Sequence, residues 1–244
     1  MFVALVLVLS GLSSVAWGDE TGACYGAREA SADAARRIAS EWPLRASGDP
    51  VSSYVQQLAE RLRVGLDGTG RKRWRFDVAR NLAPSAFAVG DGYVVLTDGL
   101  VSFVRDESQL AAVLAHEIAH VLEGHFCRPG RRGGRDYQVG TLVQHYDAAA
   151  EEEADTRAVE LLQRAGFDPG AMASLLRCLA ESTPSFRNQL NRRVQALERR
   201  GFARSGAASR RDSPGFREAR RLVEEDFKGL ESAFDIENAW KRCQ

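Results

Sequence analysis

The stretch LAHEIAHVLEGH at residues 114–125 constrains this chain more than any other part of its sequence. His116, Glu117 and His120 form an H-E-x-x-H pattern, and residues four apart lie on one face of a helix. Two imidazoles placed in this way can bind one metal ion, while Glu117 reaches a water molecule bound to it. Zinc suits this set, because it accepts nitrogen and oxygen ligands and lowers the pKa of a bound water to about 7. The pattern therefore predicts a helix that carries two zinc ligands and a general base.

The pattern lies inside a segment with helical signals of its own. Asp106 and Gln109 form a D-x-x-Q start, and an apolar stretch rich in Ala and Leu runs from there to about Gly124. The competing interpretation is an accidental pattern in a helical secreted domain, with two histidines that are merely buried or cap the helix. The apolar background favours a helix buried in the core.

Two histidines do not complete a catalytic zinc site, which usually has three protein ligands. His125 lies nine residues after His116, about 180° around the helix, so it cannot join the pair unless the helix breaks. His145 stays open as a candidate. The acidic run EEEAD offers a better one, because Glu151 and Asp155 lie one turn apart on the next predicted helix. One of them can bind the metal and the other can accept an imidazole N–H.

The apolar pattern as a whole predicts an α+β fold that is mainly helical, with a small antiparallel sheet beside the H-E-x-x-H helix. Alternating, β-rich stretches predict strands at 74–79, 87–89 and 93–97, with Gly90-Asp91-Gly92 as a hairpin turn. Apolar residues at helical spacing, with breakers between them, predict helices over about 50–65, 106–124, 148–165, 169–181, 186–199 and 216–234.

The sequence predicts a signal peptide at the start of the chain, and a linker and one further helix at its end. Residues 1–18 are predicted to be a signal peptide, with an apolar run at 2–9 that is shorter than the roughly 20 residues of a membrane span. No Lys or Arg precedes that run, so an uncleaved N-terminal anchor is the alternative. The chain is thus expected to be periplasmic or secreted. Residues 19–200 are expected to form one domain, 201–214 a linker, and 215–244 an amphipathic helix docked on the domain.

Charge and cysteine content narrow the class of protein further. Thirty-three basic residues balance thirty-three acidic ones, so nothing points to a nucleic-acid partner. In an exported chain, four cysteines suggest up to two disulfides, and one of three possible pairings joins Cys24 to Cys243 and Cys127 to Cys178. Because no C-x-x-C spacing occurs, a cysteine zinc site is not expected.

Two longer stretches carry a family resemblance. SAFAVGDGYVVLTDGLVSFVRDESQLAAVLAHEIAHVLEGH at 85–125 and EEEADTRAVELLQRAGFDP at 151–169 resemble the HExxH zinc metallopeptidases of the HtpX, Oma and CAAX-prenyl-endopeptidase group, especially the exported BepA- and LoiP-like branch. The helix at 51–62 matches more weakly, and the likeness covers roughly residues 50–200. The resemblance implies a gluzincin-type domain with one zinc per chain. The residue roles that it implies are zinc ligands His116, His120 and Glu151, catalytic base Glu117, and Asp155 as acceptor of an imidazole N–H.

The resemblance also implies a zinc-dependent endopeptidase that hydrolyses unfolded or misassembled cell-envelope proteins, with envelope or outer-membrane assembly proteins as partners. A strand at 87–89 or 93–97 would pair with an extended substrate. Ser85 replaces the family's Asn, the segment between the two motifs is short, and STPSFRNQLNRRV at 182–194 lacks the family's histidine. Arg193 is the nearest match to the family's site arginine; Arg193, His145 and Tyr146 are candidates for stabilising the oxyanion. The missing histidine leaves a second function open, a zinc-binding periplasmic chaperone or adaptor with weak or lost peptidase activity.

Overall fold

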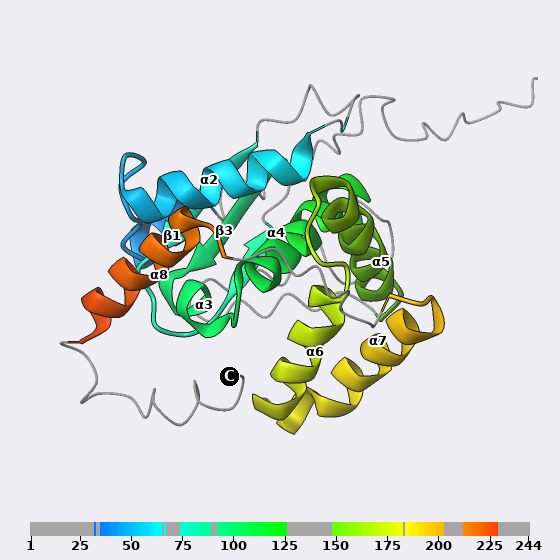
Figure 1. Cartoon of the computed structure of the whole chain (residues 1–244). Coiled ribbons are helices and arrows are strands. Elements are labelled where there is room, and N and C mark those ends of the chain that lie inside the picture. The colour runs from blue at the N-terminus through cyan, green and yellow to red at the C-terminus, as the bar shows by residue number, and fades with distance from the viewer. Residues whose placement is uncertain are drawn as a thin grey trace, which may run out of the picture.

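The computed structural model describes residues 32, 35–64, 66, 74–88, 92–125, 148–182, 184–202 and 212–228. Figure 1 shows the described elements, which in chain order are α2 (Pro50–Arg63), β1 (Arg75–Ala79), β2 (Ala86–Ala88), β3 (Tyr93–Thr97), α3 (Asp98–Phe103), α4 (Glu107–Leu122), α5 (Ala148–Ala165), α6 (Ala171–Ser182), η2 (Pro184–Phe186), α7 (Arg187–Arg199) and α8 (Pro214–Phe227). The expected signal peptide, most of the hairpin turn, the loop at 127–140 and the tail beyond 228 lie outside the described residues.

The predicted α+β class is confirmed, with a mainly helical chain and one three-stranded sheet in the order β1-β3-β2. The expectation of an antiparallel sheet is correct for β2 and β3 and wrong for β1, which pairs with β3 in parallel. The reason lies in the path of the chain. It reverses direction once between β1 and β2 and again before β3, and β3 then lies between the other two strands.

Helix α4 runs through the middle of the molecule (Figure 1). Its first turn is capped as the sequence predicts: the carboxylate of Asp106 accepts a hydrogen bond from the backbone N–H of Gln109 at 2.9 Å. The Gln109 side chain in turn accepts from the backbone N–H of Arg105 at 2.7 Å, one residue before the cap, in an arrangement similar to a capping box. Leu110, Leu114 and Ile118 are fully buried. The helix that carries both histidines is therefore a core element, held by α2, α5, α6 and β2 on its flanks.

Helix α5 packs along α4, and α7 packs against α5. Helix α5 spans 148–165 as predicted and ends where Gly166 adopts a φ of 72°, a left-handed conformation that favours glycine. The backbone N–H of Phe167 then bonds back to the carbonyl of Leu162 at 2.8 Å. The packing of α5 along α4 places the first turn of α5 beside the H-E-x-x-H residues of α4.

Helix α8 docks on α2 and α3, at the end of the molecule away from α6 and α7 (Figure 1). Phe216 is fully buried there. The buried carboxylate of Glu107 accepts hydrogen bonds from the Tyr54 hydroxyl at 3.0 Å and from the backbone N–H and hydroxyl of Ser213, so it ties α2, α4 and the start of α8 together. Helix α3 has no counterpart among the predicted elements, because six residues are too few for a helical period to be recognised.

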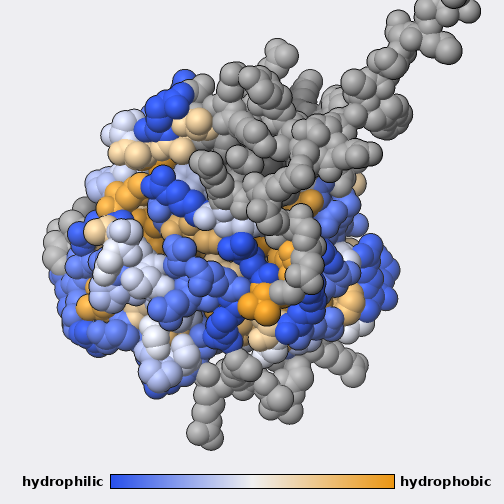
Figure 2. Space-filling view, turned by 90° about the horizontal axis from the view of Figure 1, so that it is seen from above, coloured by the Kyte–Doolittle hydropathy of each residue, from blue (hydrophilic) through white to orange (hydrophobic). Residues whose placement is uncertain are grey.

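Apolar side chains in the described part are largely internal, and only Val64 and Phe186 are large hydrophobic residues with an exposed surface. On the face shown in Figure 2, hydrophilic residues separate small apolar areas. Among the described residues, no helix combines the length and the hydrophobicity that a membrane crossing requires.

Candidate metal centre

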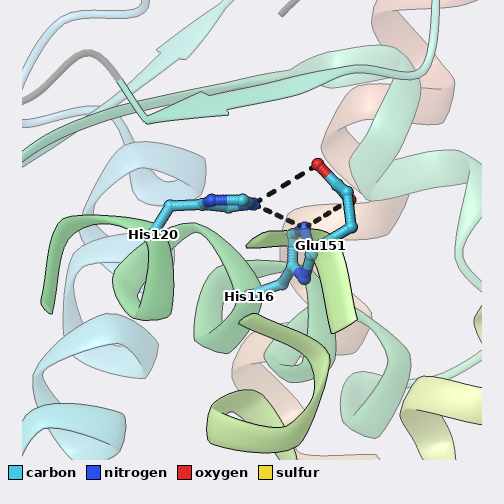
Figure 3. A group of neighbouring side chains, drawn as sticks. All are labelled: His116, His120 and Glu151. Atoms are coloured by element: carbon cyan, nitrogen blue, oxygen red, sulfur yellow. Dashed lines mark hydrogen bonds and ion pairs between the residues drawn. The ribbon is translucent and has the colours of Figure 1, made fainter. Parts of the chain in front are cut away.

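Three side chains from two helices converge at the centre of the molecule. His116 and His120 on α4 and Glu151 on α5 bring one nitrogen or oxygen atom each to within 4.8 Å of one another (Figure 3). The two Nε2 atoms lie 3.0 Å apart, and the Glu151 carboxylate lies 3.5 Å from Nε2 of His116 and 3.7 Å from Nε2 of His120. Within the described part of the chain, this is the one such group that could hold a metal ion.

The donor set fits a zinc ion. Two imidazole nitrogens and one carboxylate oxygen are a usual protein ligand set of a catalytic zinc, which keeps a fourth position for water or substrate. In a tetrahedral site with bonds of about 2.1 Å, neighbouring ligand atoms lie about 3.4 Å apart. The separation of the two Nε2 atoms, 3.0 Å, and the distances from them to the two Glu151 oxygens, 3.5 Å to Oε2 and 3.7 Å to Oε1, lie on either side of that value.

Asp155 contacts the ring nitrogen of His116 that faces away from Glu151, and Arg193 contacts both Asp155 and Glu151. Nδ1 of His116 lies 3.0 Å from a carboxylate oxygen of Asp155, which is almost fully buried. The guanidinium of Arg193, on α7, donates to both oxygens of Asp155 at 2.7 and 2.6 Å, and its third nitrogen lies 2.6 Å from Glu151. One arginine thus links a candidate ligand to the residue that orients a second one.

The electrostatics of the group favour positive charge at its centre. Burial lowers the pKa of His116, but the carboxylates of Asp155 and Glu151 more than offset this and raise it to about 10. Burial raises the pKa of Asp155, yet Arg193 and His116 bring it down to about 2. The pKa of His120 is well below its usual value, because of burial and the neighbouring His116. The two acids therefore stay ionised, and a bound cation would replace the proton of His116.

Glu117 has the environment of a base that works near neutral pH. Burial, the largest influence, raises its pKa to about 7, with an opposing contribution from His116. The backbone N–H of Ala88, on β2, donates to its carboxylate. Its Oε2 atom is buried and has no hydrogen-bond partner among the described residues. That oxygen can accept a proton from a water molecule in the site.

Of the three residues predicted to stabilise the oxyanion, only Arg193 lies within the described part of the chain. Arg193 reaches the site, but its nitrogens contact the Asp155 and Glu151 carboxylates. His145 and Tyr146 lie outside the described residues, as does Cys127. Cys178 is disulfide-bonded, and its partner also lies outside them, so the predicted pairing with Cys127 stays a prediction.

The contact that His125 makes in the structure is not predicted by the sequence pattern. It stays out of the converging group, as helix geometry predicts, yet its Nδ1 lies 2.7 Å from Nδ1 of His120. Helix α4 ends at Leu122, and Gly124 adopts a φ of 63°, which turns the chain back on itself. The signal was present in the sequence, since glycine one residue before His125 is typical of a helix end.

Comparisons with known proteins point to one family. Residues 50–130, which include His116, Glu117 and His120, match the model of peptidase family M48. The chain is 31% identical over 166 residues to a beta-barrel assembly-enhancing protease of Yersinia pestis, and 30% identical over 164 residues to that of Escherichia coli K12. It is 29% identical over 166 residues to the mitochondrial metalloendopeptidase OMA1 of Schizosaccharomyces pombe.

The shared region is only part of each relative. The match covers 55% of this chain and 34% of the Yersinia protein, 54% and 34% for the Escherichia coli protein, and 59% and 49% for the Schizosaccharomyces protein. The chain therefore spans about a third of the length of the bacterial relatives.

Proposed function

We propose that this chain, whose residues 50–130 match the model of peptidase family M48, is a zinc-dependent endopeptidase with one zinc ion held by His116, His120 and Glu151. The convergence of these three side chains beside a buried Glu117 is the observation that carries the proposal. Family M48 alone supports a peptidase; the metal, the ligand set and the role of Glu117 are inferred from the arrangement of the site.

In the proposed mechanism, Glu117 moves the protons. When bound, zinc supplies a Lewis acid that polarises the substrate carbonyl and acidifies a water molecule. Glu117 accepts a proton from the water through its buried Oε2, and the water oxygen can then attack the carbonyl carbon of the substrate. The same carboxyl then donates the proton to the leaving amine nitrogen. Burial raises the pKa of this carboxyl above its usual value, which helps one group both to accept and to donate a proton.

The edge of β2 is the place where we expect an extended substrate to lie. Of the two predicted segments, 93–97 is excluded, because β3 is paired on both sides. Among the described residues, β2 is an edge strand, and Ala88 within it donates to Glu117. The bond from Thr97 N–H to the Ser85 carbonyl makes Ala86 and Ala88 the residues whose backbone groups point away from β3. Backbone pairing there selects for unfolded chain rather than for one sequence.

Replacing Ala86 with proline tests this edge. Ala86→Pro removes one outward N–H without removing a bond to β3, and proline is tolerated on strand edges. Because a lost backbone hydrogen bond costs about 1 kcal/mol, we expect KM for an unfolded substrate to rise several-fold while kcat changes little. Ala86→Val keeps the N–H and should behave as the native protein. Equal KM values for the two variants would exclude pairing at this position.

The proposed substrates are unfolded or misassembled proteins of the cell envelope. The sequence of the first eighteen residues favours export to the periplasm or beyond. The bacterial relatives are named for beta-barrel assembly, so envelope or outer-membrane assembly proteins are the proposed partners.

A zinc-binding chaperone or adaptor is the second candidate, because the 182–194 segment has no histidine. Casein hydrolysis by the purified chain separates the two functions. An endopeptidase loses casein hydrolysis with a chelator and regains it with added zinc. If the native chain leaves casein intact but suppresses aggregation, and Glu117→Gln suppresses it equally well, the binding function is the correct one.

A further inference from the structure

His120 contacts a second buried histidine on the side of its ring that faces away from the metal centre. Its Nε2 faces His116 and Glu151, whereas its Nδ1 lies 2.7 Å from Nδ1 of His125. The side chain of His125 has no exposed surface. The contact is therefore an internal one between two rings, and water does not compete for it.

The chain reaches this position through the turn after α4. The helix ends at Leu122, and Gly124 lies in the left-handed region with a φ of 63°. Had the helix continued, His125 would lie on the face opposite His116. The glycine instead brings the His125 ring against the His120 ring, with centroids 4.8 Å apart.

His125 also contacts the second helix of the site. Its Nε2 lies 3.3 Å from the carboxylate of Glu153 on α5, two residues after Glu151. The contacts therefore form a chain from His120 through His125 to Glu153, which joins α4 to α5 at a second point. Asp155 makes the corresponding contact with Nδ1 of His116 on the other side of the group.

The distances determine which atom donates in each contact. A ring nitrogen that binds a metal carries no proton, so a neutral His120 that binds through Nε2 holds its proton on Nδ1. That proton is donated to Nδ1 of His125, because only one of two nitrogens 2.7 Å apart can be the donor. His125 then has its own proton on Nε2 and donates it to Glu153.

We propose that His125 is a positioning residue, which with Glu153 fixes the proton and the ring orientation of the zinc ligand His120. The inference rests on the proposed zinc site. It assigns to His125 the function that Asp155 has for His116. Outer partners of this kind typically change metal affinity by about 10- to 100-fold when they are removed.

Zinc affinity of the folded, full chain tests the proposal, measured by competition with a chromophoric chelator. Asn and Leu have nearly the same shape, but only Asn offers an oxygen where Nδ1 of His125 lies. We expect His125→Leu to bind zinc at least about tenfold more weakly than the native chain, and His125→Asn to stay within about threefold of it. A purely structural role predicts that both variants weaken zinc binding equally, and that result would overturn the proposal.

Glu153→Leu removes the acceptor of the outer contact without changing a buried residue, and it tests the proposal if His125→Leu does not fold. Glu160→Leu is the matched control, because its carboxylate lies on the same helix with a similar exposed fraction, 46% against 41%. We expect Glu153→Leu to weaken zinc binding about threefold or more relative to Glu160→Leu; equal affinities would overturn the proposal. If the native chain itself binds no zinc, the proposed function fails, and this inference fails with it.

Discussion

Glu117→Gln is expected to lower casein hydrolysis by about 10²- to 10⁴-fold while the variant keeps its zinc. The amide has nearly the shape of the carboxylate, and its oxygen can still accept the hydrogen bond from the Ala88 N–H. It cannot take up a proton from water. The proposed ligand atoms of His116, His120 and Glu151 are unchanged. The loss should therefore appear in kcat, with the zinc content and the melting temperature close to those of the native chain.

The pH dependence of the native chain provides the companion measurement. Glu117 acts as a base only when ionised, so kcat/KM should fall as the pH drops through its pKa, which burial raises to about 7 without a bound cation. A bound cation favours the carboxylate and shifts this limb to lower pH. Glu160→Gln is the control, with an unchanged rate expected. Casein hydrolysis by Glu117→Gln at the native rate would exclude this mechanism.

Arg193→Leu is expected to destabilise the metal-free chain by about 3–5 kcal/mol, because it leaves the buried Asp155 and Glu151 carboxylates without their arginine. For a chain of this size, the corresponding fall in melting temperature is on the order of 10 °C. Differential scanning calorimetry with a chelator present measures it. Arg192→Leu removes a neighbouring exposed arginine and is the matched control.

The loss of stability should depend on pH in a defined direction. In the native chain the pKa of Asp155 is about 2, below its usual value, so the carboxylate contributes stability that is present above about pH 4 and lost as the pH falls through 2. Without Arg193, His116 still opposes the effect of burial, but the pKa of this acid is higher in the variant than in the native chain. The variant therefore gains less stability from the ionised carboxylate, and the difference between native chain and variant should grow as the pH rises from about 2 to about 4. Equal melting temperatures for Arg193→Leu and Arg192→Leu would contradict a stabilising role for the contacts of Arg193 with Asp155 and Glu151.

Local sequence signals predicted those elements whose causes are local. The bounds of α5 follow from its apolar spacing and from Gly166, and the start of α4 follows from Asp106 and Gln109. The parallel pairing of β1 with β3 could not be predicted in this way, because it depends on the order in which distant strands meet. Helix α3 is too short for a period to be recognised.

In the candidate site, too, local spacing predicted some residues, whereas contacts between distant residues could not be predicted. The spacing of His116 and His120 determines their common face, and the acidic run on the next helix predicts the region of the proposed third ligand, which the structure brings close to the two histidines. The contact of Arg193 with Asp155 spans 38 residues, so no local pattern could predict it. His125 was placed by assuming a continuous helix, and the turn at Gly124 brings it to His120 instead.

Zinc content of the purified full chain and of Glu151→Ala, measured after both are loaded with zinc and dialysed against a weak chelator, tests whether His116, His120 and Glu151 hold a zinc ion. Glu151 is one of the three proposed ligands, so we expect about one zinc per native chain and close to none in the variant. Circular dichroism confirms that both are folded. A native chain that retains no zinc, or a Glu151→Ala variant that retains as much as the native chain, would contradict the assignment.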